Sequence, residues 1–230
     1  MSWFDQQLAI GSLVQFFKDD GGKASDFGRR VYQTFEALSF AQTIKWYKDQ
    51  NWTVAIINPG TGGKGEFRLK YSTRGDTKNF TYAKCTNPND QSEIVQIRHQ
   101  IRVETAYNKR RRRSSLRANI VCDVAVLSDG NYDYIVGNMH VSNERLITFS
   151  EAKHMDAYAE LVAAFIGLVH ELQPWRLAHD VKKMRLQYAH HPRPWLNISG
   201  VCMATAEGIK HTIGQRGLDI EVHDSRNPLV

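Results

Sequence analysis

Three charged side chains that interrupt or end apolar segments are the strongest sign of chemistry in this sequence. Asp123 lies inside the apolar run IVCDVAVL, residues 120–127, and Glu151 and Lys153 end the run ITFSEAK, residues 147–153. Because side chains alternate along a strand, Glu151 and Lys153 share one face of it. An unpaired buried carboxylate costs several kcal/mol, so Asp123 needs a partner. If the two strands are neighbours in the sheet, Glu151 and Lys153 are the expected partners of Asp123.

Two carboxylates beside one ammonium group form an oxygen-rich site that suits Mg²⁺ or Mn²⁺. Such an ion polarises a phosphodiester and acidifies a bound water, while a lysine orients that water or stabilises charge in the transition state. The three residues therefore predict metal-assisted hydrolysis. The structural alternative is an ion pair between Asp123 and Lys153, with Glu151 as a solvated strand end.

The spacing of an acid followed two residues later by a lysine occurs three times in the chain. Asp76-Thr77-Lys78 falls in an expected turn, and Asp180-Val181-Lys182 falls in a polar, helix-like stretch. Only Glu151-Ala152-Lys153 ends an apolar strand, with a strand that carries an aspartate before it and an amphipathic helix after it. This context favours the third occurrence.

Composition and cysteine content limit the class of protein. The chain has 230 residues, of which 42% are hydrophobic and 23% charged, as in an ordinary globular protein. No apolar run approaches the roughly 20 residues that span a membrane, and the first residues do not resemble a signal peptide. Cys85, Cys122 and Cys202 have no paired spacing, which argues against disulfides and a cysteine zinc site. We therefore expect a cytoplasmic protein without a membrane partner.

The positive charge is concentrated in one tract. The net charge is +6, and five of the positive charges are contiguous. Such a tract attracts polyphosphates, of which nucleic acid is the commonest. A solvated loop or a targeting signal is the alternative. The residues expected to contact nucleic acid are Lys109, Arg110, Arg111, Arg112, Arg113 and Arg117.

Apolar periodicity predicts one α/β domain over residues 1–230, with a mixed sheet flanked by helices. Its core covers about residues 25–222, and residues 1–22 form a helical extension. We expect helices at 3–17, 25–44, 158–172 and 206–215 and strands at 52–57, 95–103, 120–127, 147–153, 196–203 and 218–222. Hairpins are expected at 67–82 and around 132–136, where the second would return antiparallel to strand 120–127.

Several local details follow from the same patterns. Ser25 is the expected N-cap of the helix at 25–44, and Asp156 that of the helix at 158–172. Alternation in strand 95–103 places Arg98 on a polar face. The adjacent residues His190-His191 have no partner at metal-ligand spacing, so we interpret them as part of a loop.

The order of elements and the charged residues resemble the PD-(D/E)xK, or restriction-endonuclease-like, nuclease superfamily. Its core is a helix, a sheet with an aspartate on one strand and Glu-x-Lys on the next, and then a helix. Asp123 and Glu151/Lys153 match that pattern at a separation of 28 residues, which the inserted hairpin would accommodate. Cys122 stands where the family name has proline. The likeness covers about residues 25–222 as an order of elements, but only three residues as a motif.

The resemblance implies roles for five residues. Asp123 and Glu151 would bind the metal, and Lys153 would be the catalytic base. Many relatives add an acid from the first core helix, which would be Glu36 as a further metal ligand. Polar residues early in the next helix often assist, which points to Glu160 as an accessory residue.

The implied activity is a metal-dependent nuclease that acts on DNA, and by analogy it would serve prokaryotic restriction or anti-phage defence. One alternative is a catalytically inactive nucleic-acid-binding subunit on the same fold, and another is an RNA-directed nuclease. The chain carries no helicase or sensor motif, so a separate protein partner would supply sensing or helicase activity.

Overall fold

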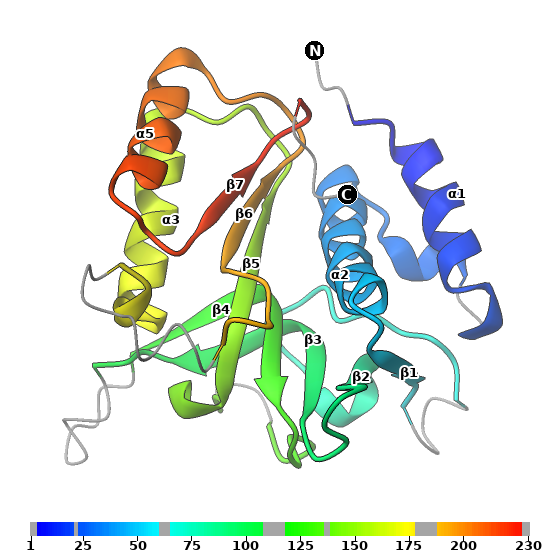
Figure 1. The fold of residues 1–230 in the computed structure, drawn as a ribbon. Coiled ribbons are helices and arrows are strands. Elements are labelled where there is room, and N and C mark those ends of the chain that lie inside the picture. Colours follow the sequence, from blue (N-terminus) through cyan, green and yellow to red (C-terminus); the bar gives the residue numbers. More distant parts are fainter. Residues whose placement is uncertain are drawn as a thin grey trace.

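A computed structural model gives the fold of the chain (Figure 1). The residues that it describes are 4–20, 23–59, 65–107, 118–135, 139–177 and 188–226.

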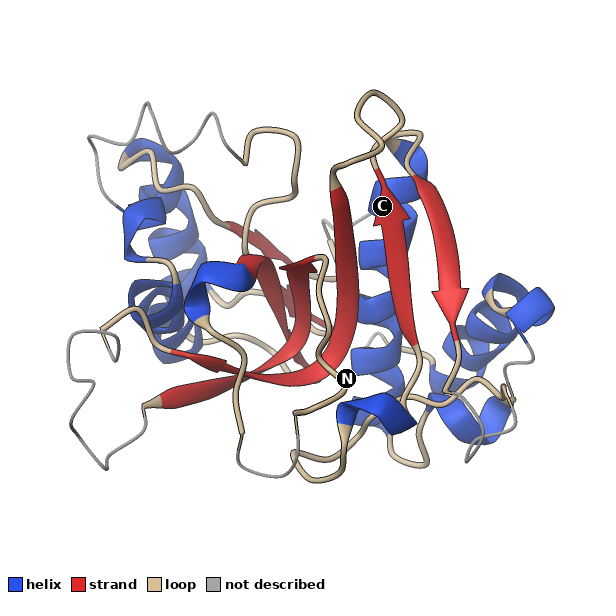
Figure 2. Cartoon of the chain, turned by 90° about the horizontal axis from the view of Figure 1, so that it is seen from below, coloured by secondary structure: helices blue, strands red, loops and turns tan. Residues whose placement is uncertain are grey.

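A seven-stranded sheet, in which neighbours follow chain order, forms the middle layer (Figures 1 and 2). The first five strands pair antiparallel, whereas β5–β6 and β6–β7 pair parallel, so the sheet is mixed as predicted. The strands are β1 (Thr53–Ile57), β2 (Tyr82–Thr86), β3 (Ile94–Glu104), β4 (Asn119–Ser128), β5 (Leu146–Lys153), β6 (Trp195–Ile198) and β7 (Glu221–His223).

Helices cover both faces of this sheet, which confirms the α/β class. In Figure 1, α1 (Gln6–Phe16) and α2 (Val31–Asp49) lie on one side, and α3 (Ala159–Leu172) and α5 (Ala204–Gln215) lie on the other. Short 3₁₀ helices occur at Lys18–Asp20, Ala24–Phe27, Thr77–Asn79, Asn143–Arg145 and Pro174–Leu177. No helix within the described ranges is long and apolar enough to cross a membrane.

Each face has its own hydrophobic core because apolar side chains alternate across the sheet. The α2-side core joins helical and strand residues that include Phe17, Phe40, Ile44, Ile97, Val126 and Ile147. The α3-side core includes Phe149, Val162, Phe165, Val169, Leu196 and Ala206. β4 contributes to both cores, as expected for a strand buried on both faces.

Both predicted helix caps are wrong because their side chains have other positions or partners. Ser25 lies in the 3₁₀ helix Ala24–Phe27, and α2 begins after Arg30 as its N-cap. Asp156 accepts a hydrogen bond from the Val201 backbone N–H at 2.9 Å, so it fastens the entry of α3 to the segment after β6.

The hairpin predicted at 67–82 is also wrong. The described residues 65–81 contain no strand, although Phe67 and Leu69 are buried. Arg68 and Thr81 exchange two hydrogen bonds of 2.7 Å, and the 3₁₀ turn Thr77–Asn79 interrupts any longer pairing. The apolar alternation in this segment correctly predicted that the side chains of Phe67 and Leu69 are buried. It did not identify the strand partner, because β2 pairs with β1 and β3 instead of with this segment.

The hairpin expected around 132–136 is absent from the described residues between β4 and β5, namely 129–135 and 139–145. Thr77 Oγ1 donates to the Tyr132 carbonyl there, and Val141 forms an isolated bridge to Val103. Arg98 also departs from its predicted polar face. It is 4% exposed, and its guanidinium carbon lies 3.9 Å from the centre of the Tyr82 ring. A cation–π contact thus takes the place of solvent.

Candidate active site

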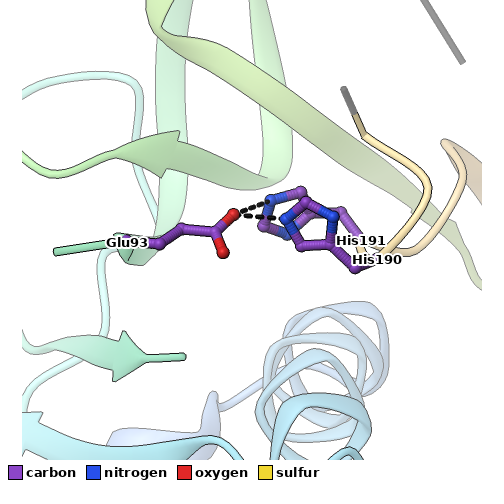
Figure 3. Close-up of side chains that lie close together, drawn as sticks. All are labelled: Glu93, His190 and His191. Carbon is purple, nitrogen blue, oxygen red and sulfur yellow. Dashed lines mark hydrogen bonds and ion pairs between the residues drawn. The ribbon is translucent and has the colours of Figure 1, made fainter. Parts of the chain in front are cut away.

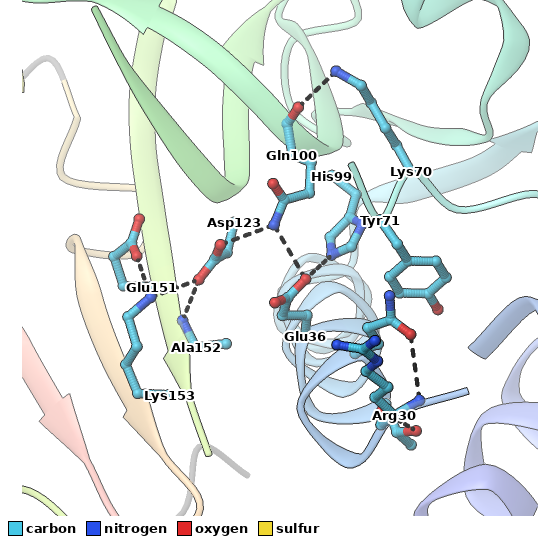
Figure 4. Close-up of polar contacts among 12 residues, drawn as sticks. Arg30, Glu36, Lys70, Tyr71, His99, Gln100, Asp123, Glu151, Ala152 and Lys153 are labelled. Atoms are coloured by element: carbon cyan, nitrogen blue, oxygen red, sulfur yellow. Dashed lines mark hydrogen bonds and ion pairs between the residues drawn. The ribbon is translucent and has the colours of Figure 1, made fainter. Parts of the chain in front are cut away.

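The site lies where β4 and β5 separate (Figure 4). Their ladder begins at the pair Val124–Ser150, and beyond Ser150 strand β5 continues beside β6 instead. At this fork the backbone N–H of Ala152 donates to Asp123 Oδ2 at 2.9 Å. A side-chain carboxylate therefore satisfies a buried amide that the diverging strand no longer pairs.

An irregularity in β3 helps to shape the site. Val95 and Ile97 belong to the α2-side core, whereas Ile101 and Val103 belong to the α3-side core. A regular strand would place these four residues on one face. Between them Gln100 has a φ of 53°, the left-handed conformation that non-glycine residues rarely adopt. The side chains consequently change faces at Gln100.

β4 changes faces at the opposite position. Cys122 belongs to the α3-side core, but Val124 and Val126 belong to the α2-side core. The pairs that flank this point are Val124 with His99 and Cys122 with Ile101, so Asp123 lies opposite Gln100 without a change of register. The coupled irregularity places the Gln100 amide between the Asp123 carboxylate and Glu36 of α2 (Figure 4).

The structure brings together the three residues selected from the sequence. Lys153 Nζ lies 2.9 Å from Glu151 Oε2 and 3.4 Å from Asp123 Oδ2. Asp123 and Glu151 are 7% and 5% exposed, whereas the Lys153 side chain is 37% exposed. The ammonium group is thus the member of the three with room to move.

Glu36, the acid expected from the first core helix, is joined to this group through Gln100. The Gln100 amide nitrogen donates to Asp123 Oδ1 at 3.0 Å and to Glu36 Oε2 at 3.1 Å. Glu36 Oε2 also lies 3.6 Å from His99 Nε2. Lys70 Nζ donates to the Gln100 carbonyl at 3.0 Å, which holds the backbone of this residue (Figure 4).

Gln100 and His99 were missed in the sequence because they appear as ordinary positions of an alternating strand. The only signal was an unusually polar run, QIRHQIR, within a predicted strand whose first and last residues, Val95 and Val103, are apolar. The left-handed backbone at Gln100 has no marker in the sequence.

The electrostatics of the site show an excess of buried negative charge. Burial, and then the charge of Asp123, raise the pKa of Glu151 to about 8 and that of Glu36 to about 7. Burial alone would lower the pKa of Lys153, but the Glu151 and Asp123 carboxylates raise it above its ordinary value. Burial lowers the pKa of His99 to about 4, so this imidazole is neutral near pH 7.

Three carboxyl groups and one ammonium group therefore share a poorly solvated space, and a divalent cation would remove the imbalance. Asp123 and Glu151 would hold Mg²⁺ or Mn²⁺ directly, since hard cations prefer carboxylate oxygens. Glu36 faces the same space from α2 (Figure 4). Among the described residues, no set of three ligand atoms within 4.8 Å of one another includes a Glu36 oxygen, so we describe Glu36 as an outer member of the site.

The remaining predicted residues are not part of this group. Glu160 is exposed in the first turn of α3, and no contact within the described ranges joins it to Asp123, Glu151 or Lys153. The basic tract Lys109–Arg113 and Arg117 lie outside the described residues, so their role stays a prediction.

The chain was also compared with known proteins at three levels. No family model, no curated protein and no solved structure matches it.

Proposed function

We propose that this protein is a metal-dependent nuclease that hydrolyses phosphodiester bonds in DNA. One observation carries the proposal: the buried carboxylates of Asp123 and Glu151 meet the Lys153 ammonium where two strands diverge. An aspartate, Glu-x-Lys and a preceding helical acid are the features that resemble the PD-(D/E)xK superfamily. The helix α2 before the sheet and α3 after Lys153 support a restriction-endonuclease-like fold.

In this proposal each side chain has a separate task. Asp123 and Glu151 would hold Mg²⁺ or Mn²⁺, and Gln100 keeps Asp123 oriented by its hydrogen bond of 3.0 Å. The bound ion would polarise the phosphodiester and acidify a water. Lys153 would orient that water. A cation on the two carboxylates would remove the charges that raise the lysine pKa, so the ammonium would release its proton to solvent and the neutral amine would then accept the proton of the water.

Nucleic acid is the proposed substrate because the positive charge of the chain is concentrated between residues 109 and 117. A role in prokaryotic defence, a protein partner for sensing or helicase activity and a cytoplasmic location belong to the same proposal. They rest on the analogy with nucleases of this kind.

The test is cleavage by the purified protein of single- and double-stranded DNA and RNA, with Mg²⁺, Mn²⁺ or EDTA. Lys153→Met removes the ammonium group and keeps most of the side-chain volume. Lys78→Met is the matched control, because Lys78 follows an acid at the same spacing, is 58% exposed and lies outside the site.

The expected result is metal-dependent cleavage that Lys153→Met loses and Lys78→Met keeps. Cleavage of RNA alone would redirect the proposal to an RNA-directed nuclease. Binding without cleavage under every condition would support the inactive nucleic-acid-binding subunit. Full activity of Lys153→Met would overturn the assignment of the site.

A further inference from the structure

A second polar cluster joins the start of β3 to the segment before β6 (Figure 3). Glu93 Oε1 lies 3.2 Å from His191 Nε2 and also contacts His190 Nε2. One ligand atom from each of the three residues lies within 4.8 Å of the others. The histidines are in a loop, as predicted, but the prediction that they lack a partner is wrong. Their partner Glu93 comes 97 residues earlier in the chain than His190.

Buried aromatic residues hold the two imidazoles. The hydroxyl of Tyr47, a residue of α2 with no exposed surface, lies 2.9 Å from His191 Nδ1. The ring of Trp52 stacks on the His190 ring, with 6.4 Å between the ring centres, and packs against the His191 ring, with 5.5 Å between the ring centres. A hydrogen bond to one ring nitrogen orients the other, which is the usual arrangement around a metal-bound histidine. Here that other nitrogen of His191 points at Glu93.

The surroundings change the pKa values of His191 and Glu93. Burial, and then His190, lower the pKa of His191 to about 4, so its imidazole is neutral near pH 7. Burial of Glu93 is outweighed by hydrogen bonds from His190 and Asn87, which lower the pKa of the carboxyl.

The ligand set and its surroundings indicate which metal. Two imidazole nitrogens and one carboxylate oxygen match the borderline-soft Zn²⁺, whereas Mg²⁺ prefers oxygen alone. Three protein ligands would leave one position free. A cavity of about 410 Å³ adjoins the cluster and is lined by Glu93 and His191 together with Asp129 and Glu144.

We propose that Glu93, His190 and His191 form a zinc site, distinct from the acidic site, which fastens the segment before β6 to the start of β3. Ligand atoms at about 2.0–2.1 Å from a tetrahedral zinc ion lie roughly 3.3 Å apart. The three atoms here lie within 4.8 Å of one another, so binding would draw them together by at most about 1.5 Å. The fourth position faces the cavity and would hold water.

The experiment is a titration of the metal-stripped full chain with Zn²⁺ against a chromophoric chelator, together with metal analysis after dialysis. His190→Asn is the main variant, because His190 is 45% exposed and can be replaced without disturbing the core. His211→Asn is the control, since His211 is an exposed histidine of α5 that contacts Gln215. Asp123→Asn reports on the acidic site.

The wild type, His211→Asn and Asp123→Asn should each bind one zinc ion tightly, and His190→Asn should bind it at least about a hundredfold more weakly. A rise in Tm with Zn²⁺ should be lost in the same variant. Absence of tight binding by the wild type would show that the cluster is held by hydrogen bonds alone. Zinc binding that survives His190→Asn, or that is lost in Asp123→Asn, would also overturn the proposal.

Discussion

The acidic site and the Glu93–His190–His191 cluster both lie against α2, but they solve the burial of charge differently. Glu36 belongs to the acidic site, and Tyr47 contacts His191 of the second cluster. These two residues of α2 are 11 positions apart. At 1.5 Å per residue this is about 16 Å, or three turns, along the helix. In the acidic site burial and like charge raise the pKa of Glu36 and Glu151. In the second cluster, imidazole hydrogen bonds lower the pKa of Glu93.

This difference indicates what each cluster needs. The acidic site has more carboxyl groups than its single ammonium group can neutralise, so it is complete only with a cation or extra protons. The second cluster satisfies its one carboxylate through contacts with His190, His191 and Asn87. Zn²⁺ would replace hydrogen bonds there, whereas Mg²⁺ or Mn²⁺ would relieve repulsion in the acidic site.

The largest expected effect is a loss of DNA cleavage in variants of the acidic site but not in a variant of the second cluster. Lys153→Met should lower turnover on DNA by at least about a hundredfold, the lower range for loss of a general acid–base group. Asp123→Asn and Glu151→Gln should do the same, and far-ultraviolet circular dichroism should show intact folds. His190→Asn should keep wild-type turnover in Mg²⁺. Equal losses in His190→Asn and Lys153→Met would mean that the clusters form one functional unit.

The second prediction uses pH. The pKa of Glu36 rises from 4.5 to about 7 in the fold, so the native state binds a proton more tightly than the unfolded chain. The metal-free protein should therefore lose stability as pH rises from about 5 to 8, with up to roughly 3 kcal/mol from this group. Urea unfolding in EDTA should show that Glu36→Gln exceeds wild type in stability at pH 8 but not at pH 5. If the stability difference between Glu36→Gln and wild type does not change with pH, the pKa of Glu36 is not raised in the fold.

The third prediction concerns metal preference. Mn²⁺ at a hundred times its Kd should stabilise the wild type by about 2.7 kcal/mol. Asp123→Asn should remove that gain and keep the gain from Zn²⁺, and His190→Asn should do the reverse. Thermal melts of the three proteins with each ion measure both effects. If both ions lose their effect in the same variant, the two sites do not select different metals.

The smallest expected effect concerns substrate binding. Replacing Arg110 to Arg113 with serine should weaken binding to every DNA sequence alike, because phosphate contacts carry no sequence information. Each lost contact should reduce the log–log salt slope by roughly 0.9 on duplex DNA. Fluorescence anisotropy at several salt concentrations gives the slope. An unchanged slope would show that the tract does not contact the nucleic acid.

The local pattern of the chain was enough to predict most elements and the central three residues. A nearly continuous apolar run identified β4 and apolar alternation identified β5, and their apolar character made Asp123 and Glu151 stand out as charges that require partners. Such inferences succeed because burial of apolar side chains with period two or 3.6 is a property of the segment itself. The mixed α/β class followed from the same signals.

The tertiary fold determined everything that depends on which segments meet. The Gln100 side chain, at a residue with left-handed backbone, joins Glu36 to Asp123, and Asp156 bonds to the Val201 backbone instead of capping α3. His190 gained a carboxylate neighbour from 97 residues away. Periodicity reports burial but not the identity of the neighbour, since pairing across a sheet is set by the packing of the whole chain.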